Sequence, residues 1–238
     1  MEPTEHNRRA WDEIHRRRSE TLADQLGIPG PVKERLPEVK GKHVLHLQCA
    51  TGESTAELAE LGALVTGVDI SAEALAVARE RVPDAALVQA DVHELPLQFR
   101  RGRFDLVYTG GGVLHWLQDL DTWAQAIASA LKPGGELLLY DTHPVSACVD
   151  RIAHWREDYF NEDTLVDVGW KHFDLEGDPP QEAKHERFWR LGQVVTALAQ
   201  ARLVIRSLEE FPTIYETFWR ERDPRVPGEF VLRAAKPS

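Results

Sequence analysis

Two short segments, residues 43–54 and 65–71, most constrain how this chain can fold. The first reads HVLHLQCATGES, an apolar run followed by small residues, and the second reads VTGVDIS. The second apolar run ends in an acid, Asp69, seventeen positions beyond Gly52. This order predicts a strand, a tight turn, a helix and a second strand, whose terminal acid can accept hydrogen bonds from ribose hydroxyls. Such a unit is the nucleoside-binding half of a doubly wound fold.

Both helices of this unit carry recognisable start signals. Ser54 is followed three positions later by Glu57, which fits a capping box, and an apolar helical face follows. Ser71 is a good N-cap residue, and Glu73 would place an acid in the first turn, where it complements the helix dipole. We therefore expect one helix to begin at Ser54 and the next directly after Ser71.

The turn also indicates which nucleoside cofactor fits. A dinucleotide site favours the pattern G-x-G-x-x-G, so that a pyrophosphate can approach the backbone, but here only Gly52 is a glycine. The turn instead resembles the first motif of class I S-adenosylmethionine-dependent methyltransferases, in the small-molecule branch that reads L-H-L-Q-C-x-x-G. His46 stands where most members carry an acid near the methionine amino group, and Gln48 and Ala50 replace glycines. The resemblance implies S-adenosylmethionine as cofactor and S-adenosylhomocysteine as product.

Further matches to this family follow along the chain. An acid after the family's third strand contacts the adenine amino group and the next amide meets the ring, roles that the resemblance assigns to Asp91 and Val92. A predicted strand at 104–108 leads into Thr109 and three glycines, residues 110–112. Consecutive glycines at a strand end are costly in entropy and indicate that the backbone passes close to something, although a loose surface loop is the alternative. We interpret the run as room for the sulfonium end and the acceptor.

The sequence LKPGG at 131–135, before another apolar segment, also resembles the family and supplies a helix stop and a turn. The matches extend over residues 44–143, about 40% of the chain. Together the segments predict an α/β fold with a doubly wound, Rossmann-like, seven-stranded sheet. The sheet is expected to be mostly parallel with an antiparallel last strand at 230–234 and helices on both faces.

The chain divides into four segments by composition and pattern. Residues 1–39 are predicted to form an N-terminal helix, from about His6 to Leu26, and a Pro/Gly-rich linker, and the family resemblance implies a lid over the cofactor. Residues 40–143 form the cofactor-binding core. Residues 144–189 lose the strand–helix alternation and are rich in aromatic residues, which suits a cap over the acceptor pocket. Residues 190–238 return to the core.

The resemblance and the strand ends together give a set of candidate site residues. The expected cofactor-binding residues are Trp11, His46, Gln48, Cys49, Ala50, Gly52, Ser54, Asp69, Ile70, Ser71, Asp91, Val92, His93, Thr109 and Gly110. The expected substrate-binding residues are Gly111, Trp116, Tyr159 and Trp170. The histidines show no metal-ligand spacing, so no metal site is expected.

Composition limits the class of partner. The 238 residues carry a formal net charge of −11, which disfavours non-specific binding to nucleic acid and favours a small-molecule acceptor. No run of eighteen apolar residues predicts a membrane-spanning helix, and the polar N-terminus indicates neither a signal nor a transit peptide. The two cysteines, Cys49 and Cys148, do not form a disulfide framework, so we expect a cytoplasmic protein. The oligomeric state stays open.

Methyl transfer from a sulfonium is an in-line displacement, so positioning supplies much of the acceleration. A base is needed only if the acceptor carries a proton at neutral pH, and the candidates are His115 and His143, which both follow strands at the active edge. The leading prediction is therefore a methyltransferase acting on O or N of a small molecule. A non-catalytic S-adenosylmethionine-binding protein is the first alternative, and an NAD(P)-dependent oxidoreductase, which lacks its phosphate loop here, is the second.

Overall fold

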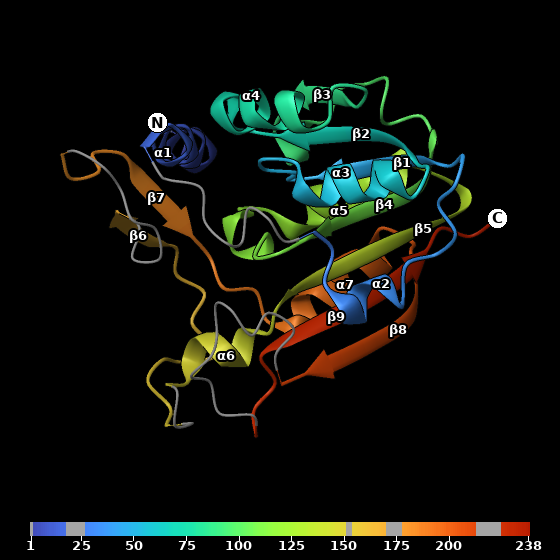
Figure 1. The fold of residues 1–238 in the computed structure, drawn as a ribbon. Coiled ribbons are helices and arrows are strands. Elements are labelled where there is room, and N and C mark those ends of the chain that lie inside the picture. Colours follow the sequence, from blue (N-terminus) through green and yellow to red (C-terminus); the bar gives the residue numbers. More distant parts are fainter. Residues whose placement is uncertain (1, 18–26, 151–153, 170–177, 213–224) are drawn as a thin grey trace.

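The alternating apolar segments form a seven-stranded sheet at the centre of the molecule (Figure 1). The structure, a computed structural model, describes residues 2–17, 27–150, 154–169, 178–212 and 225–238. The strands in spatial order are β3 (Ala86–Gln89), β2 (Leu64–Asp69), β1 (His43–Leu47), β4 (Phe104–Gly110), β5 (Leu131–Thr142), β9 (Glu229–Ala235) and β8 (Val204–Phe211). The pairs among β3, β2, β1, β4 and β5 are parallel, and β9 runs antiparallel to both β5 and β8. The predicted fold class is confirmed.

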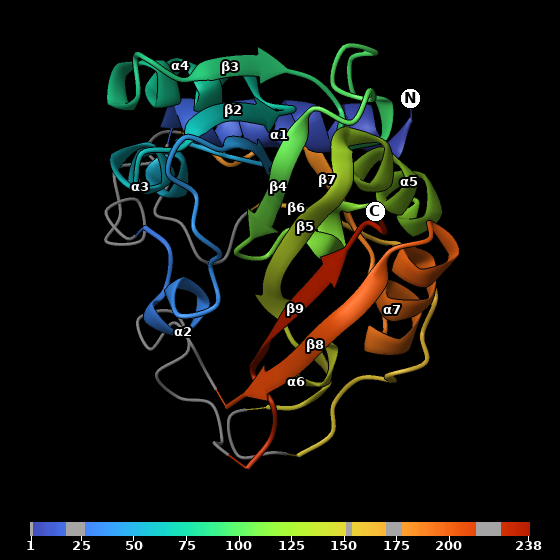
Figure 2. The same cartoon turned by 90° about the vertical axis from the view of Figure 1, so that its right-hand side faces the viewer.

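Helices cover both faces of this sheet, as Figure 2 shows edge-on. On one side lie α2 (Gly30–Lys33), α3 (Glu53–Glu60) and α4 (Ala72–Arg81), and on the other lie α5 (Leu120–Ala130) and α7 (Leu191–Gln200). The period-two alternation of the strands divides the core accordingly. In β1, Val44 packs into the cluster under α2 and α3, whereas Leu45 and Leu47 pack into the cluster under α5 and α7. No described helix is long and apolar enough to cross a membrane.

A second layer lies beyond the carboxyl ends of the parallel strands. The N-terminal helix α1 (Pro3–Arg17) lies there beside a separate two-stranded sheet, β6 (Leu165–Val168) with β7 (Ala183–Glu186), as seen at the left of Figure 1. The predicted N-terminal helix is thus present over residues 3–17, while positions 18–26 lie outside the described residues. The predicted segment boundaries at 39, 143 and 189 stay predictions.

Of the two predicted helix starts, one is wrong in detail and the other is confirmed. Helix α3 begins at Glu53 after Gly52, whose φ of 87° forms the N-cap without a side-chain bond, so Ser54 already lies inside the helix. The carboxylate of Glu57 is not part of a capping box, because it accepts a hydrogen bond from the Ile28 amide at 2.6 Å. The Ser71 cap is confirmed, since its hydroxyl accepts from the Ala74 amide.

The start of α5 and the linker also differ from expectation. We would place the cap of α5 at Asp121 from sequence, but Asp119 caps it by accepting from the Thr122 amide at 3.0 Å. The Pro/Gly-rich stretch at 27–37 contains the short helix α2 rather than only extended chain. Val32 of α2 is fully buried against the sheet, which is why this segment is ordered.

Candidate active site

A cavity lies where the carboxyl ends of four parallel strands meet the underside of α1. Its void is about 780 Å³, a volume that includes space open to solvent. The lining residues are Thr4, Asn7, Trp11, His15, Gln48, Ala50, Asp69, Ile70, Ala90, Asp91, Val92, His93, Gly110, Gly111, Gly112, Val113, Trp116 and Leu117. This is the edge at which ligands bind in doubly wound folds.

The turn after β1 adopts a left-handed conformation at alternate residues. Gln48, Ala50 and Gly52 have φ angles of 53°, 45° and 87°, a region that is strained for residues with a Cβ. Gln48 compensates by donating from Nε2 to the carbonyl of Val113 at 3.0 Å. The side chain therefore ties the turn after β1 to the loop after β4, across the cavity.

Asp69 closes β2 and is held by this same turn. Its Oδ2 accepts from the Ala50 amide at 2.8 Å and its Oδ1 accepts from the Ser71 amide at 2.9 Å. Burial raises the pKa of the Asp69 carboxyl, and these amide hydrogen bonds oppose that rise. Each oxygen keeps lone-pair capacity toward the cavity that it lines, so Asp69 can accept hydrogen bonds from a diol.

A second acid closes the next strand. Asp91 precedes the short 3-10 helix η2 (Val92–Glu94), and its Oδ1 accepts from the amide and from Nδ1 of His93, at 2.9 and 2.7 Å. Burial works against ionisation, but the His93 hydrogen bonds outweigh it and lower the pKa of Asp91. The other ring nitrogen of His93, Nε2, is buried and has no partner among the described residues.

The glycine run after β4 forms the floor of the cavity against β5. A Cβ at Gly110 would lie 2.2 Å from the Tyr140 ring, so no larger residue fits. Beyond the glycines, the buried Asp141 accepts from the amides of Val113 and Leu114 at 2.9 and 2.7 Å. Burial raises the pKa of Asp141 to about 6. At Gly110, the close neighbour that the glycine run predicts is thus Tyr140 of β5.

Helix α1 closes the cavity from above and is fastened on both sides. On one side, Asp12 accepts from the hydroxyl of Ser71, two residues beyond Asp69, at 2.8 Å. Asn7 pairs with the backbone of His185 on β7, accepting at 2.6 Å and donating at 2.8 Å. Trp11 meets Trp116 edge-on with ring centroids 5.0 Å apart. The helix thus joins the cofactor half to the β6–β7 pair.

Most predicted site residues at strand ends line this cavity, whereas several neighbours do not. Among the predicted cofactor and substrate residues, those that line it are Trp11, Gln48, Ala50, Asp69, Ile70, Asp91, Val92, His93, Gly110, Gly111 and Trp116. Those absent from the lining are His46, Cys49, Gly52, Ser54, Ser71, Thr109 and Tyr159. Trp170 lies outside the described residues.

Three of the residues that do not line the cavity, His46, Cys49 and Tyr159, pack elsewhere in the fold. His46 is buried on β1, its Nδ1 is 2.8 Å from the Thr55 hydroxyl, and burial lowers its pKa to about 3. Cys49 is buried against Gly67 of β2. Tyr159 lies in a different groove, beside Trp189. The cofactor and substrate roles of these residues stay predictions.

The two candidate bases occupy different surroundings. His143 is buried, its Nδ1 accepts from the Val145 amide to cap α6 (Pro144–Cys148), and its Nε2 lies 2.9 Å from Glu210. Both of its ring nitrogens are therefore engaged away from the cavity lining. His115 lies in the 3-10 helix η3 (Leu114–Trp116), beside the cavity residue Gly112. Burial lowers the pKa of His115 to about 4, so the ring is neutral at pH 7.

Comparison with known proteins agrees with this geometry. Residues 45–139 match the methyltransferase domain family. The chain is 40% identical over 112 residues to an uncharacterized methyltransferase of Synechocystis sp., a match that covers 46% of this chain and 51% of the relative. Residues 45–139 therefore carry the methyltransferase domain, the family that the sequence predicts. The predicted family and cofactor are thereby confirmed.

One further sequence relative and one solved structure show how much of the chain is similar to known methyltransferases. A trans-aconitate 2-methyltransferase of Delftia acidovorans is 34% identical over 107 residues, which covers 44% of this chain and 40% of that protein. The chain thus spans about half or less of the length of these curated relatives. An S-adenosylmethionine-dependent methyltransferase structure from Mesorhizobium loti superposes with a TM-score of 0.65 at 24% identity, covering 87% of this chain and 96% of that one.

The residues that line the cavity fit a nucleoside on their own chemistry. Two strand-terminal acids, Asp69 and Asp91, are separated by the apolar lining of Ile70 and Val92, which suits a sugar diol and a flat base with a polar edge. His93 also lines the cavity, and its buried Nε2 has no hydrogen-bond partner among the described residues. When bound, the cofactor supplies an electrophilic methyl group. Within the described segments, no cluster of His, Cys, Asp or Glu could hold a metal ion.

Sequence reasoning missed part of the cavity wall. The lining residues absent from the predicted set of site residues are Thr4, Asn7, His15, Ala90, Gly112, Val113 and Leu117. Gly112 and Ala90 adjoin predicted residues and could have been found by extending each strand end by one position. Asn7 and His15 could have been found from helical spacing, because they lie one turn on either side of Trp11.

Proposed function

We propose that this chain transfers a methyl group from S-adenosylmethionine to an oxygen or nitrogen atom of a small organic molecule. The observation that carries the proposal is one cavity with two chemical halves. Asp69 and Asp91 line the nucleoside half, while Trp11, Trp116 and the backbone at Gly111 line the other. An apolar, aromatic wall beside a few polar groups favours a small organic acceptor.

The similarity to a trans-aconitate 2-methyltransferase supports a small-molecule acceptor as well. The role of the protein is positioning, because the leaving group is already activated and the acceptor must lie in line with the carbon–sulfur bond. Trp11 and Trp116 would orient the acceptor, and His115 would take up its proton. We propose a cytoplasmic location, which cell fractionation would test.

Calorimetric titration with S-adenosylhomocysteine, with NADH in parallel, tests the cofactor half first. We expect binding of the first and not of the second. Asp69→Asn should raise the dissociation constant for S-adenosylhomocysteine by about 10–100-fold, because hydrogen bonds to a charged acceptor contribute ~1.5–3 kcal/mol. Asp105→Asn is the control: this acid lies at the opposite end of β4, where it accepts from the His43 amide, and should leave binding unchanged.

Transfer of a labelled methyl group to libraries of O- and N-acceptors tests the second half. A labelled product would establish turnover. Tight cofactor binding without product from any acceptor class would instead favour a binding protein, and NADH binding would favour an oxidoreductase. Fold alone does not separate these outcomes.

A further inference from the structure

Strand β7 places the carboxylate of Glu186 near His115, and the ammonium group of Lys184 pairs with that carboxylate. Glu186, the last residue of β7, places Oε1 3.9 Å from Nε2 of His115. Its other oxygen, Oε2, accepts from Nζ of Lys184 at 2.8 Å. The backbone fixes this arrangement, because the Arg187 amide donates to the His115 carbonyl at 2.8 Å. The three side chains therefore form a row, Lys184–Glu186–His115.

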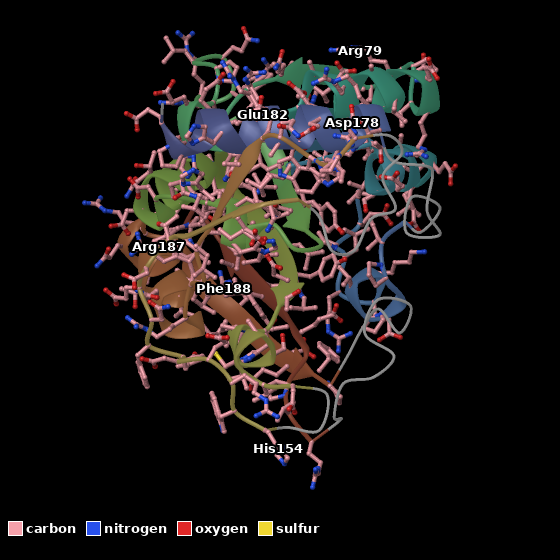
Figure 3. The ribbon with its side chains drawn as sticks, turned by 90° about the vertical axis from the view of Figure 1, so that its left-hand side faces the viewer. Arg79, His154, Asp178, Glu182, Arg187 and Phe188 are labelled. Carbon is pink, nitrogen blue, oxygen red and sulfur yellow. The ribbon has the colours of Figure 1, made fainter. Side chains whose placement is uncertain are left out.

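His115 stands between this row and the cavity. A Cβ built on Gly112, which lines the cavity, would lie 3.4 Å from Cε1 of His115, so the His115 ring lies against the glycine run that borders the cavity. Trp116 on one side and Phe188 on the other limit rotation of the ring, with centroid distances of 4.6 and 6.3 Å. Figure 3 shows Phe188 and Arg187 where the chain leaves β7, well away from Glu182 beside α1.

Resting on the methyl-transfer function above, we propose that Glu186 and Lys184 are positioning residues that prepare His115 to accept the acceptor's proton. The Glu186 carboxylate favours the tautomer with the proton on Nε2 and leaves Nδ1 as the basic atom. During transfer, the acceptor atom bonds to the methyl carbon as the carbon–sulfur bond breaks. That bond's electron pair stays on sulfur, and the acceptor's proton moves to Nδ1 of His115.

The charges around His115 act in opposite directions. Burial lowers the pKa of His115 most strongly, Glu186 raises it and Lys184 lowers it. Titratable groups on the other elements packed here have partners of their own. Asp141 of β5 binds the Val113 and Leu114 amides, His15 of α1 stacks on Trp11, and His185 of β7 lies 2.8 Å from His6. Lys184 and Glu186 are thus the pair whose substitution should shift the pKa of His115 in opposite directions.

Nuclear magnetic resonance of the histidine-labelled full chain tests this without any acceptor. The His115 signals are assigned by their loss in His115→Gln. In the wild type we expect the Nε2–H tautomer at pH 7, and in Glu186→Gln a mixture that includes Nδ1–H. In Lys184→Met the pKa of His115 should rise by about one unit, whereas the charge-conserving Lys184→Arg should keep it unchanged. Glu182→Gln removes a charge from the same segment, far from His115, and should change neither quantity.

An unchanged tautomer in Glu186→Gln together with an unchanged pKa in Lys184→Met would overturn the proposal. Retained S-adenosylhomocysteine binding shows that each variant is folded, and if Lys184→Met does not fold, the tautomer in Glu186→Gln alone decides. With an acceptor from the library, His115→Gln should lower kcat by about 100-fold or more, the range for general-base catalysis. Glu186→Gln should shift the pH profile of kcat with little change in KM. If the proposed methyl transfer fails, no variant turns over, yet the tautomer and pKa shifts are still observed.

Discussion

The strained turn after β1 offers a sharp test, because two residues in it have the same strain but different contacts. Ala50 and Gln48 both have positive φ, which costs about 1–2 kcal/mol relative to glycine. Replacement by glycine removes that strain but also costs ~0.4–1 kcal/mol through the freer unfolded chain. Ala50→Gly should therefore raise the free energy of unfolding by about 1 kcal/mol.

Gln48→Gly should have the opposite sign. The glycine removes the same backbone strain as in Ala50→Gly. The variant also loses the hydrogen bond from Gln48 and leaves the Val113 carbonyl without this donor, at a cost of ~1–3 kcal/mol. We expect a net loss of about 1 kcal/mol. The two variants should then differ by roughly 2 kcal/mol, or about 4–8 °C in Tm for a chain of this size.

Urea and thermal unfolding, without cofactor, measure these differences. Arg202→Gly is the matched control, because Arg202 has a φ of 63° in the exposed turn between α7 and β8, far from the cavity. It should be stabilising like Ala50→Gly. If Gln48→Gly stabilises the protein as much as Ala50→Gly does, the tie between Gln48 and Val113 contributes nothing, and the reasoning is refuted.

Three other perturbations follow from single contacts. Asn7→Ala should cost about 2 kcal/mol in urea unfolding and weaken S-adenosylhomocysteine binding in calorimetry, because it leaves the His185 amide without its acceptor, while the His185 carbonyl keeps Gln118 as a donor at 3.3 Å. Gly110→Ala should cost about 3 kcal/mol by the same unfolding assay, since its Cβ would overlap the Tyr140 ring. The pKa of Asp141 is about 6 when folded, above its unfolded value, so its contribution to stability is full below pH ~4 and is lost as pH rises through 6. The stability advantage of the wild type over Asp141→Asn should therefore be about 1 kcal/mol larger at pH 5 than at pH 7, by urea unfolding at both pH values.

The strands and the two strand-terminal acids could be predicted because they depend on local patterns. A buried strand that ends in an acid places that acid at the carboxyl edge whatever the rest of the chain does, and Asp69 and Asp91 both line the cavity. The strand period also explains the position of His46. It is two positions from Val44, and in a strand this spacing puts both on the same buried face, where His46 packs against Tyr108.

The predictions that failed depend on contacts between distant parts of the chain. Ser54 and Glu57 have capping-box spacing, but the left-handed Gly52 starts the helix one residue earlier and the Ile28 amide, 29 positions away, takes up the Glu57 carboxylate. The Lys184–Glu186–His115 row could not be predicted for the same reason, since no local sequence pattern shows that Glu186 lies near His115.

The same long-range contacts explain why the acceptor wall belongs to no single segment. Trp116 comes from the loop after β4, and the ring it meets, Trp11, comes from α1. Helix α1 is held in place from two sides, by Ser71 at the start of α4 and by His185 on β7. An acceptor that packs between these rings therefore depends on the cofactor half and on the β6–β7 pair at once. Because Glu186 lies one position beyond His185, the strand residue that pairs with Asn7 of α1 directly precedes the acid that faces His115.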